Sequence, residues 1–231
     1  MIIYNLNILF IILLIIFNSK LNIKLNKFIF NLFFLYTLFF VGLRECGADW
    51  NIYIDYFEKI TENENFKLSS GGDLLFEYTA YVISKTYFGF VQEFINQLDL
   101  SMAEDFTNDF WNPIGIGDQR KTSASFYFFT LFSALLCLYP IFKFCSRFQD
   151  RWTCLLIAYP YFIIIVSMSA IRQSIAIGFL FLAIISLLDK KKILFIFYIL
   201  IGTLFHKSLI IMMSLLVLTA NEIKFKYIFL F

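Results

Sequence analysis

Arg172 and Gln173 are the polar residues whose surroundings most strongly indicate chemistry. They lie in SAIRQSIAIGF (169–179), between the uncharged stretches AYPYFIIIVSM and LFLAIISLL. A guanidinium at the centre of a bilayer costs about 2.5–3.5 kcal/mol on insertion scales. Arg172 therefore either extends to the lipid headgroups, as arginines near helix ends do, or binds an anion at a functional site.

His206 is the only histidine, and it lies in the next apolar segment. At about 1.5 Å of helical rise per residue, Arg172 lies roughly 24 Å from Leu188. On the same basis His206 lies roughly 20 Å from Ile193, across one short turn. The sequence thus predicts that Arg172 and His206 meet at nearly one depth. Small and polar residues beside Arg172 predict a helix-packing stripe: Ser169, Gln173, Ala176 and Ala183.

Composition predicts an all-α, polytopic integral membrane bundle with a single domain over residues 1–231. Hydrophobic residues make up 60% and charged residues 16%, whereas soluble proteins are about 45–50% apolar. The net charge of +2 gives no reason to expect nucleic acid as a partner. Four cysteines without a CxxC pair, one histidine, and the lack of GxxxxGK[ST], GxGxxG, GxSxG and DxD motifs predict no cofactor and no metal.

Apolar runs of about 20 residues predict the membrane spans. They cover residues 2–17, 28–43, 125–142, 152–168, 171–188 and 193–219, with polar loops at 44–73 and 96–124. Residues 74–95 form a weaker segment, interrupted by charges, that either spans the membrane or is re-entrant. The start of another span at 227 predicts that the chain is truncated at its C-terminus.

Basic clusters predict the orientation, because loops rich in lysine and arginine face the cytoplasm. The clusters are Lys20, Lys24 and Lys27, then Lys143, Arg147 and Arg151, then residues 190–192. Both polar loops and the Arg172 end are then expected outside. These assignments agree only if residues 74–98 cross the membrane an even number of times, so a re-entrant hairpin and a wrong loop assignment both stay open.

Three segments resemble the EpsG/Wzy-type family of bacterial polysaccharide polymerases. AIRQSIAIGF, a lysine-rich turn and LIGTLFHKSLII are similar to the family's Arg-Gln, small-residue helix and Phe-His pair. GLRECGADWNIYIDYF resembles its R-x-x-x-G-x-D-[aromatic]-x-x-Y-x-x-x-F segment, and Glu77 stands where the family has an acidic residue opening a helix. The resemblance covers residues 28–90 and 125–218. The loop at 96–124 is longer than expected, and the family's further C-terminal helices are missing.

This resemblance implies polymerisation of polyprenyl-diphosphate-linked oligosaccharide repeat units into O-antigen, capsule or exopolysaccharide. The reaction would be a metal-independent glycosyl transfer on the outer face of the bacterial plasma (inner) membrane. The implied partners are the lipid-linked oligosaccharide, the lipid bilayer, a chain-length regulator and a flippase.

The resemblance also assigns expected roles to residues. Arg172 would bind the departing diphosphate, because its planar fork binds phosphate oxygens bidentately. Asp49 is the first candidate for the base that accepts the acceptor hydroxyl's proton, and His206 is the second. The expected substrate-binding residues are Arg44, a second candidate for the diphosphate, Trp50 and Tyr53, whose rings would stack on sugar, and Glu77 and Gln173.

Two other functions stay open from sequence. A flippase for lipid-linked oligosaccharide would line a central cavity with cations from several helices, whereas here charge is concentrated at one end. A membrane acyltransferase acting on polysaccharide would use a lone intramembrane histidine as its base. In that case His206 would be indispensable and Arg172 secondary.

Overall fold

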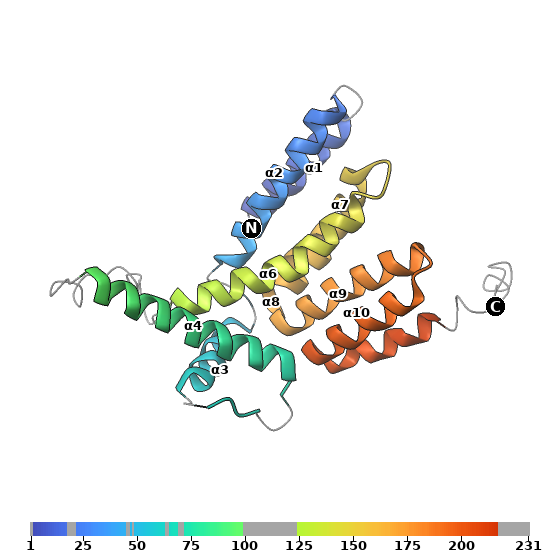
Figure 1. The fold of residues 1–231 in the computed structure, drawn as a ribbon. Helices are drawn as coiled ribbons and strands as arrows, with labels where there is room; N and C mark the ends of the chain where they lie inside the picture. Colours follow the sequence, from blue (N-terminus) through green and yellow to red (C-terminus); the bar gives the residue numbers. More distant parts are fainter. Residues whose placement is uncertain are drawn as a thin grey trace.

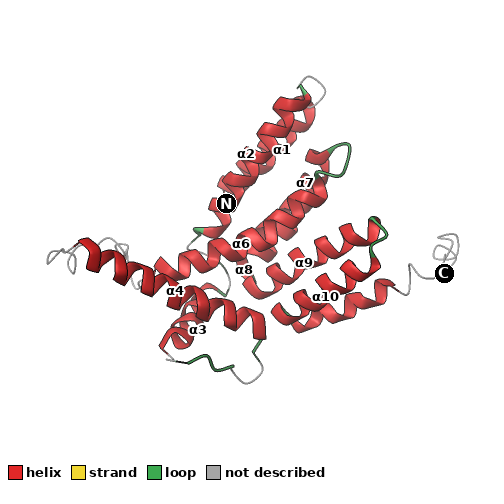
Figure 2. Cartoon of the chain, in the orientation of Figure 1, coloured by secondary structure: helices red, strands yellow, loops and turns green. Residues whose placement is uncertain are grey.

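The computed structural model describes residues 2–17, 22–44, 47, 49–62, 65–68, 72–98 and 124–216. Within these ranges all regular structure is helical, as Figure 2 shows. Four helical segments are long and apolar enough to cross a membrane: Ile23–Gly42, Ser125–Cys145, Arg151–Ser169 and Ile171–Leu188. The predicted class, an all-α polytopic membrane protein, is confirmed.

The centre of the bundle is a row of packed helices. α1 (Ile2–Phe17) packs on α7 (Arg151–Ala158), α2 (Ile23–Gly42) packs on α6 (Ala124–Cys145), and α6 packs on α9 (Ile171–Leu188). Gly178 allows α9 to approach α6 closely, since a Cβ there would lie 2.2 Å from the carbonyl oxygen of Leu136.

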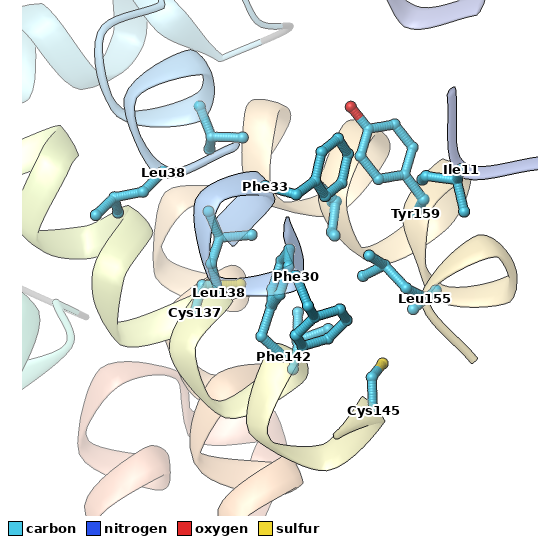
Figure 3. Close-up of a cluster of buried hydrophobic side chains, with 14 of the residues drawn as sticks. Ile11, Phe30, Phe33, Leu38, Cys137, Leu138, Phe142, Cys145, Leu155 and Tyr159 are labelled. Atoms are coloured by element: carbon cyan, nitrogen blue, oxygen red, sulfur yellow. The ribbon is translucent and has the colours of Figure 1, made fainter. Parts of the chain in front are cut away.

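Aromatic side chains fill the space between α2, α6 and α7 (Figure 3). The Phe30 ring centroid is 5.2 Å from that of Phe142 and 5.1 Å from that of Trp152, and all three side chains are buried. Tyr159 is also buried, and its hydroxyl accepts a 2.7 Å hydrogen bond from the Asn7 amide. Because lipid is as apolar as these rings, close packing and such interhelical hydrogen bonds hold the helices together.

The segment Arg151–Ser169 changes helical geometry along its length. α7 continues into the π-helix η2 (Tyr159–Val166) and the short α8 (Ser167–Ser169). Pro160 lies at the start of η2. Proline has no N–H and its ring crowds the preceding turn, which favours a local change to the wider π turn.

The basic segments meet at one end of the bundle, which we call the basic end. Trp152 Nε1 donates to Asn26 Oδ1 at 2.6 Å and joins the start of α7 to the start of α2. The Arg147 guanidinium binds Asp189 at 2.7 Å and joins the α6–α7 loop to the end of α9. The described cations of the basic end are Lys24, Lys27, Lys143, Arg147, Arg151, Lys190, Lys191 and Lys192.

Helices α3 (Trp50–Glu62) and α4 (Leu74–Leu98) lie at the opposite end, the α3–α4 end (Figure 1). Thr130 Oγ1 donates to the Gly42 carbonyl at 2.6 Å, so α2 ends beside the beginning of α6. The intervening chain therefore leaves and returns at the same end, which agrees with an even number of crossings. α4 is one continuous helix rather than a re-entrant hairpin, and it is not among the four candidate spans.

The segment predicted to span at 193–219 differs from the prediction. α10 (Lys192–Phe205) ends at His206, which has extended backbone, and the 3₁₀-helix η3 (Lys207–Ser214) packs back on α10. Leu209 lies over Gly202, where a Cβ would come within 2.3 Å of its Cδ2. The residues on both sides of His206 are apolar, so hydropathy did not indicate the reversal. Tertiary packing on Gly202 stabilises it. Residues 217–219 lie outside the described residues.

Candidate active site

Three helix ends bring Arg172, His206 and Asp73 together at the α3–α4 end. Arg172 lies in the first turn of α9, His206 directly follows α10, and Asp73 directly precedes α4. Arg172 Nη1 is 3.5 Å from Asp73 Oδ2, and His206 Nδ1 is 3.8 Å from the same oxygen. The predicted meeting of Arg172 and His206 is therefore seen, and a carboxylate that the sequence did not single out lies between them.

The exposure of the three side chains differs. Asp73 is 6% exposed, whereas Arg172 is 37% and His206 36% exposed. A buried carboxylate is stable only when cations or donors compensate for its lost hydration, and here the Arg172 guanidinium and the His206 imidazole approach one oxygen. Arg172 contacts it through one nitrogen at 3.5 Å rather than through two short parallel bonds. Such a pair does not use the bidentate geometry that an arginine fork offers to a phosphate.

Aromatic rings surround the Arg172 guanidinium. Its central carbon is 5.9 Å from the ring centroid of Tyr53, 5.8 Å from that of Tyr56 and 5.7 Å from that of Phe76. These distances allow cation–π attraction. The Tyr56 hydroxyl in turn donates a hydrogen bond to Glu77 Oε1. Helices α3 and α4 thus fix the rings that position the guanidinium.

Local sequence explains how α3 supplies these rings. Its buried residues Trp50, Tyr53, Ile54 and Phe57 follow the spacing of one helical face. That face packs on Phe76 of α4 and on the first turns of α6, so α3 lies against the bundle instead of crossing it.

Arg44 forms a second buried cationic position at this end. It is 7% exposed, and its Nη1 donates to the Val41 carbonyl at 2.9 Å. Its guanidinium carbon lies 5.6 Å from the centroid of the Trp50 ring. Trp50 itself packs edge-on against Phe126 at 5.1 Å. Arg44 is thus anchored by its own helix end and by α3.

The remaining predicted residues lie at the same end in different surroundings. Asp49 precedes α3, and its carbonyl accepts the Tyr53 N–H at 3.0 Å. Its carboxylate has no hydrogen bond or ion pair to Arg172 or His206, all three being described residues. Glu77 is 1% exposed, whereas Gln173 is exposed on α9. Among the described residues, no three histidine, cysteine, aspartate or glutamate side chains are arranged to hold a metal ion.

Asp73 is the residue that sequence reasoning missed. The signal was the segment GGDLLFE, in which an aspartate follows two glycines and a glutamate follows four residues later. An aspartate immediately before a helix is a frequent N-cap, and residues four apart share one helix face. This pattern indicates two carboxylates on one side of the start of α4. It does not indicate that α9 and α10 end beside them.

Comparison with protein families gives a match for the C-terminal half of the chain. Residues 119–231 match the EpsG family, and this range includes Arg172, Gln173 and His206. The match confirms the predicted family resemblance for this part of the chain. Residues 28–90, which contain Asp73, lie outside the matched range. No curated protein and no solved structure matches the chain.

Proposed function

Because residues 119–231 carry an EpsG-family sequence, we propose that this membrane protein polymerises polyprenyl-diphosphate-linked oligosaccharide repeat units. The product would be O-antigen, capsule or exopolysaccharide, made by glycosyl transfer on the outer face of the bacterial plasma membrane. The family match supports a role in polysaccharide biosynthesis. We base the more specific proposal, glycosyl transfer from a polyprenyl diphosphate, on the cluster formed by Arg172, Asp73 and His206.

The position of the cluster supports an outer active site. It lies at the α3–α4 end, whereas eight described cations lie at the basic end. Loops rich in lysine and arginine stay in the cytoplasm, so the α3–α4 end faces outward. The lipid-linked substrate would then present its diphosphate at the outer membrane–water boundary, at the first turn of α9.

In the proposed reaction an acceptor sugar hydroxyl attacks the anomeric carbon of a lipid-linked donor. The bond from that carbon to the diphosphate oxygen breaks, and its electron pair leaves with the polyprenyl diphosphate. Arg172 binds the diphosphate and stabilises the negative charge that develops on it. Because the guanidinium supplies the positive charge, we propose a reaction that needs no metal ion.

The acceptor hydroxyl must lose its proton during this step. His206 and Arg172 approach the same Asp73 oxygen, so we propose His206 as the base in place of Asp49, which was the first candidate from sequence and becomes the second. Arg44 is a second anion-binding candidate. Trp50 and Tyr53 are 8% and 7% exposed, so they reach a sugar only if α3 moves. In the present arrangement their rings hold Arg44 and Arg172. Glu77 and Gln173 complete the proposed substrate-binding set.

The test replaces Arg172 with lysine or alanine in the full gene product, expressed at wild-type level in a strain lacking the native gene. Lysine keeps the charge but loses the planar fork, so both variants should reduce polymerisation about a hundredfold. Gel analysis of the glycan should then show single repeat units in place of a ladder. Arg147→Lys at the basic end is the matched control and should leave the ladder unchanged.

The same assay separates the other functions. A full-length ladder from Arg172→Lys would contradict diphosphate binding by Arg172 and leave only headgroup contact for this arginine. Complete loss of surface glycan, including single units, would indicate a flippase. An unchanged ladder with altered acylation would indicate an acyltransferase.

A further inference from the structure

Asp73 is shared by two groups that the proposed reaction uses separately. Its Oδ2 lies 3.5 Å from Arg172 and 3.8 Å from Nδ1 of His206. Both contacts are longer than the roughly 2.7–2.9 Å of a charge-assisted hydrogen bond, so in this arrangement Oδ2 makes a short hydrogen bond to neither group. Because Nδ1 faces Asp73, Nε2 is the ring nitrogen left for a substrate, and the imidazole is 36% exposed.

We propose, on the basis of the function above, that Asp73 couples diphosphate binding to the basicity of His206. Without substrate, Asp73 neutralises Arg172. When a diphosphate takes the donors of Arg172, Asp73 pairs with Nδ1–H of His206 instead. His206 is then the catalytic base, and Asp73 is a positioning residue that acts through it.

The exchange follows from charge and geometry. The 3.5 Å contact engages one guanidinium nitrogen, and a diphosphate carries more negative charge than a carboxylate and accepts bidentate bonds. A carboxylate at Nδ1 fixes the neutral tautomer that has a free Nε2 lone pair, and it stabilises the imidazolium that forms. Nε2 takes the acceptor hydroxyl's proton, while the hydroxyl oxygen bonds to the anomeric carbon and the diphosphate leaves with its electron pair.

Among the described residues, four charged side chains lie at the contact between the imidazole and Asp73 or close to it in the chain or on α4. Asp73 faces it from the start of α4, and Arg172 contacts the same carboxylate from α9. Lys207 follows it in the chain and is exposed. Glu77 lies one turn beyond Asp73 on α4 and accepts a hydrogen bond from the Tyr56 hydroxyl. The charge that changes on substrate binding is therefore the diphosphate at Arg172, and Asp73 transmits the change.

Because the chain contains a single histidine, NMR of that residue can test the coupling without an assay of polymerase activity. The full chain, labelled with ¹⁵N-histidine and reconstituted in lipid nanodiscs, is titrated by NMR with and without geranyl diphosphate. Geraniol is the control for the prenyl tail. The ligand should raise the titration midpoint of His206 by about one pH unit in the wild type. In Asp73→Asn the rise should be less than half as large, because only direct attraction to the diphosphate remains.

The outcomes separate this inference from the proposed function. Equal rises in the wild type and Asp73→Asn would overturn the coupling and leave diphosphate binding by Arg172 intact. No saturable response to geranyl diphosphate would overturn the diphosphate site itself. If Asp73→Asn does not fold, the wild-type protein alone tests the proposal. Saturating ligand should move the NMR signal of the His206 Nδ1 proton downfield, and an unchanged chemical shift would overturn the proposal.

Discussion

Helix α9 has an arginine–aspartate pair at each end, and the two pairs differ in geometry. At the basic end Arg147 binds Asp189 through two short bonds, Nη1 to Oδ1 at 2.7 Å and Nη2 to Oδ2 at 2.8 Å. At the α3–α4 end Arg172 approaches Asp73 through one nitrogen at 3.5 Å. The first pair is bidentate, whereas the second leaves that geometry unused.

Burial differs as well. Arg147 and Asp189 are 38% and 31% exposed, so water screens their attraction and reduces its value. Asp73 is 6% exposed and Arg172 is surrounded by three aromatic rings. Placing a carboxylate in such surroundings is unfavourable unless it is compensated. The two arginines are almost equally exposed, at 37% and 38%, so the difference lies in the aspartates. Asp73 carries a desolvation cost that the more exposed Asp189 does not, and this difference supports the functional role proposed for Arg172.

The largest expected contrast between the two ends is their accessibility from outside. A single cysteine is placed at position 51 (Asn51→Cys) or 191 (Lys191→Cys), with the four native cysteines replaced by alanine. A membrane-impermeant maleimide should label position 51 in intact cells and position 191 only after permeabilisation. Labelling of position 191 in intact cells would reverse the orientation and place the Arg172 cluster inside.

The next contrast compares the two aspartates. Asp73→Asn removes the charge that compensates Arg172 and, on the coupling proposed above, orients His206. Polymer yield should therefore fall by about a hundredfold. Asp189→Asn, the matched change at the basic end, should alter yield by less than about twofold, because exposed pairs contribute little. Similar losses in both variants, with normal protein levels, would remove the distinction between the two pairs.

A smaller effect is expected from Tyr56→Phe. This change keeps the ring beside Arg172 but removes the hydroxyl that donates to Glu77. Loss of a hydrogen-bond donor to the buried Glu77 carboxylate costs about 1–3 kcal/mol. The polymer yield should therefore fall roughly tenfold. Tyr139→Phe, whose exposed ring lies 5.5 Å from the Lys143 ammonium at the basic end, is the control. An unchanged ladder from Tyr56→Phe would show that the ring alone positions the guanidinium.

The sequence predicted the parts of the site that depend on helix length and membrane depth. Arg172 and His206 meet because two helices joined by a short turn carry them at similar distances from that turn. Asp73 was not predicted because it approaches from a segment about a hundred residues earlier in the chain. Its position depends on how α4 packs across the ends of the other helices, and no local pattern encodes such packing.

Two further differences have the same origin. The apolar run at 193–219 indicated one helix, but packing of Leu209 on Gly202 reverses the chain at His206. Trp50 and Tyr53 were expected to offer rings to a sugar, yet packing of α3 leaves each less than a tenth exposed. Hydropathy identifies which segments are apolar. It does not distinguish contact with lipid from contact with another helix.

The smallest expected effect concerns the pH dependence of the basic-end pair. Hydrogen bonds from Arg147, together with Lys191 and Lys143, lower the pKa of the Asp189 carboxyl, and Asp189 raises the pKa of Arg147. A lowered folded-state pKa gives stability that is present above the unfolded value, about 3.9. That stability is lost as the pH falls through the lower folded value. Arg147 stays protonated throughout, so it adds no pH dependence in this range.

Asp189→Asn should therefore lower the melting temperature of the detergent-solubilised protein by at most a few degrees at neutral pH. This difference from the wild type should be constant between about pH 5 and pH 8. It should begin to shrink below about pH 4 and vanish once the pH has fallen through the lowered pKa of the folded-state Asp189 carboxyl. Because the pair is exposed, high salt should reduce the difference at neutral pH as well. A difference that grows on acidification would mean that Asp189 is stabilised in its protonated form. The Arg147–Asp189 pair would then not be the simple surface clamp with which the Arg172–Asp73 pair is contrasted.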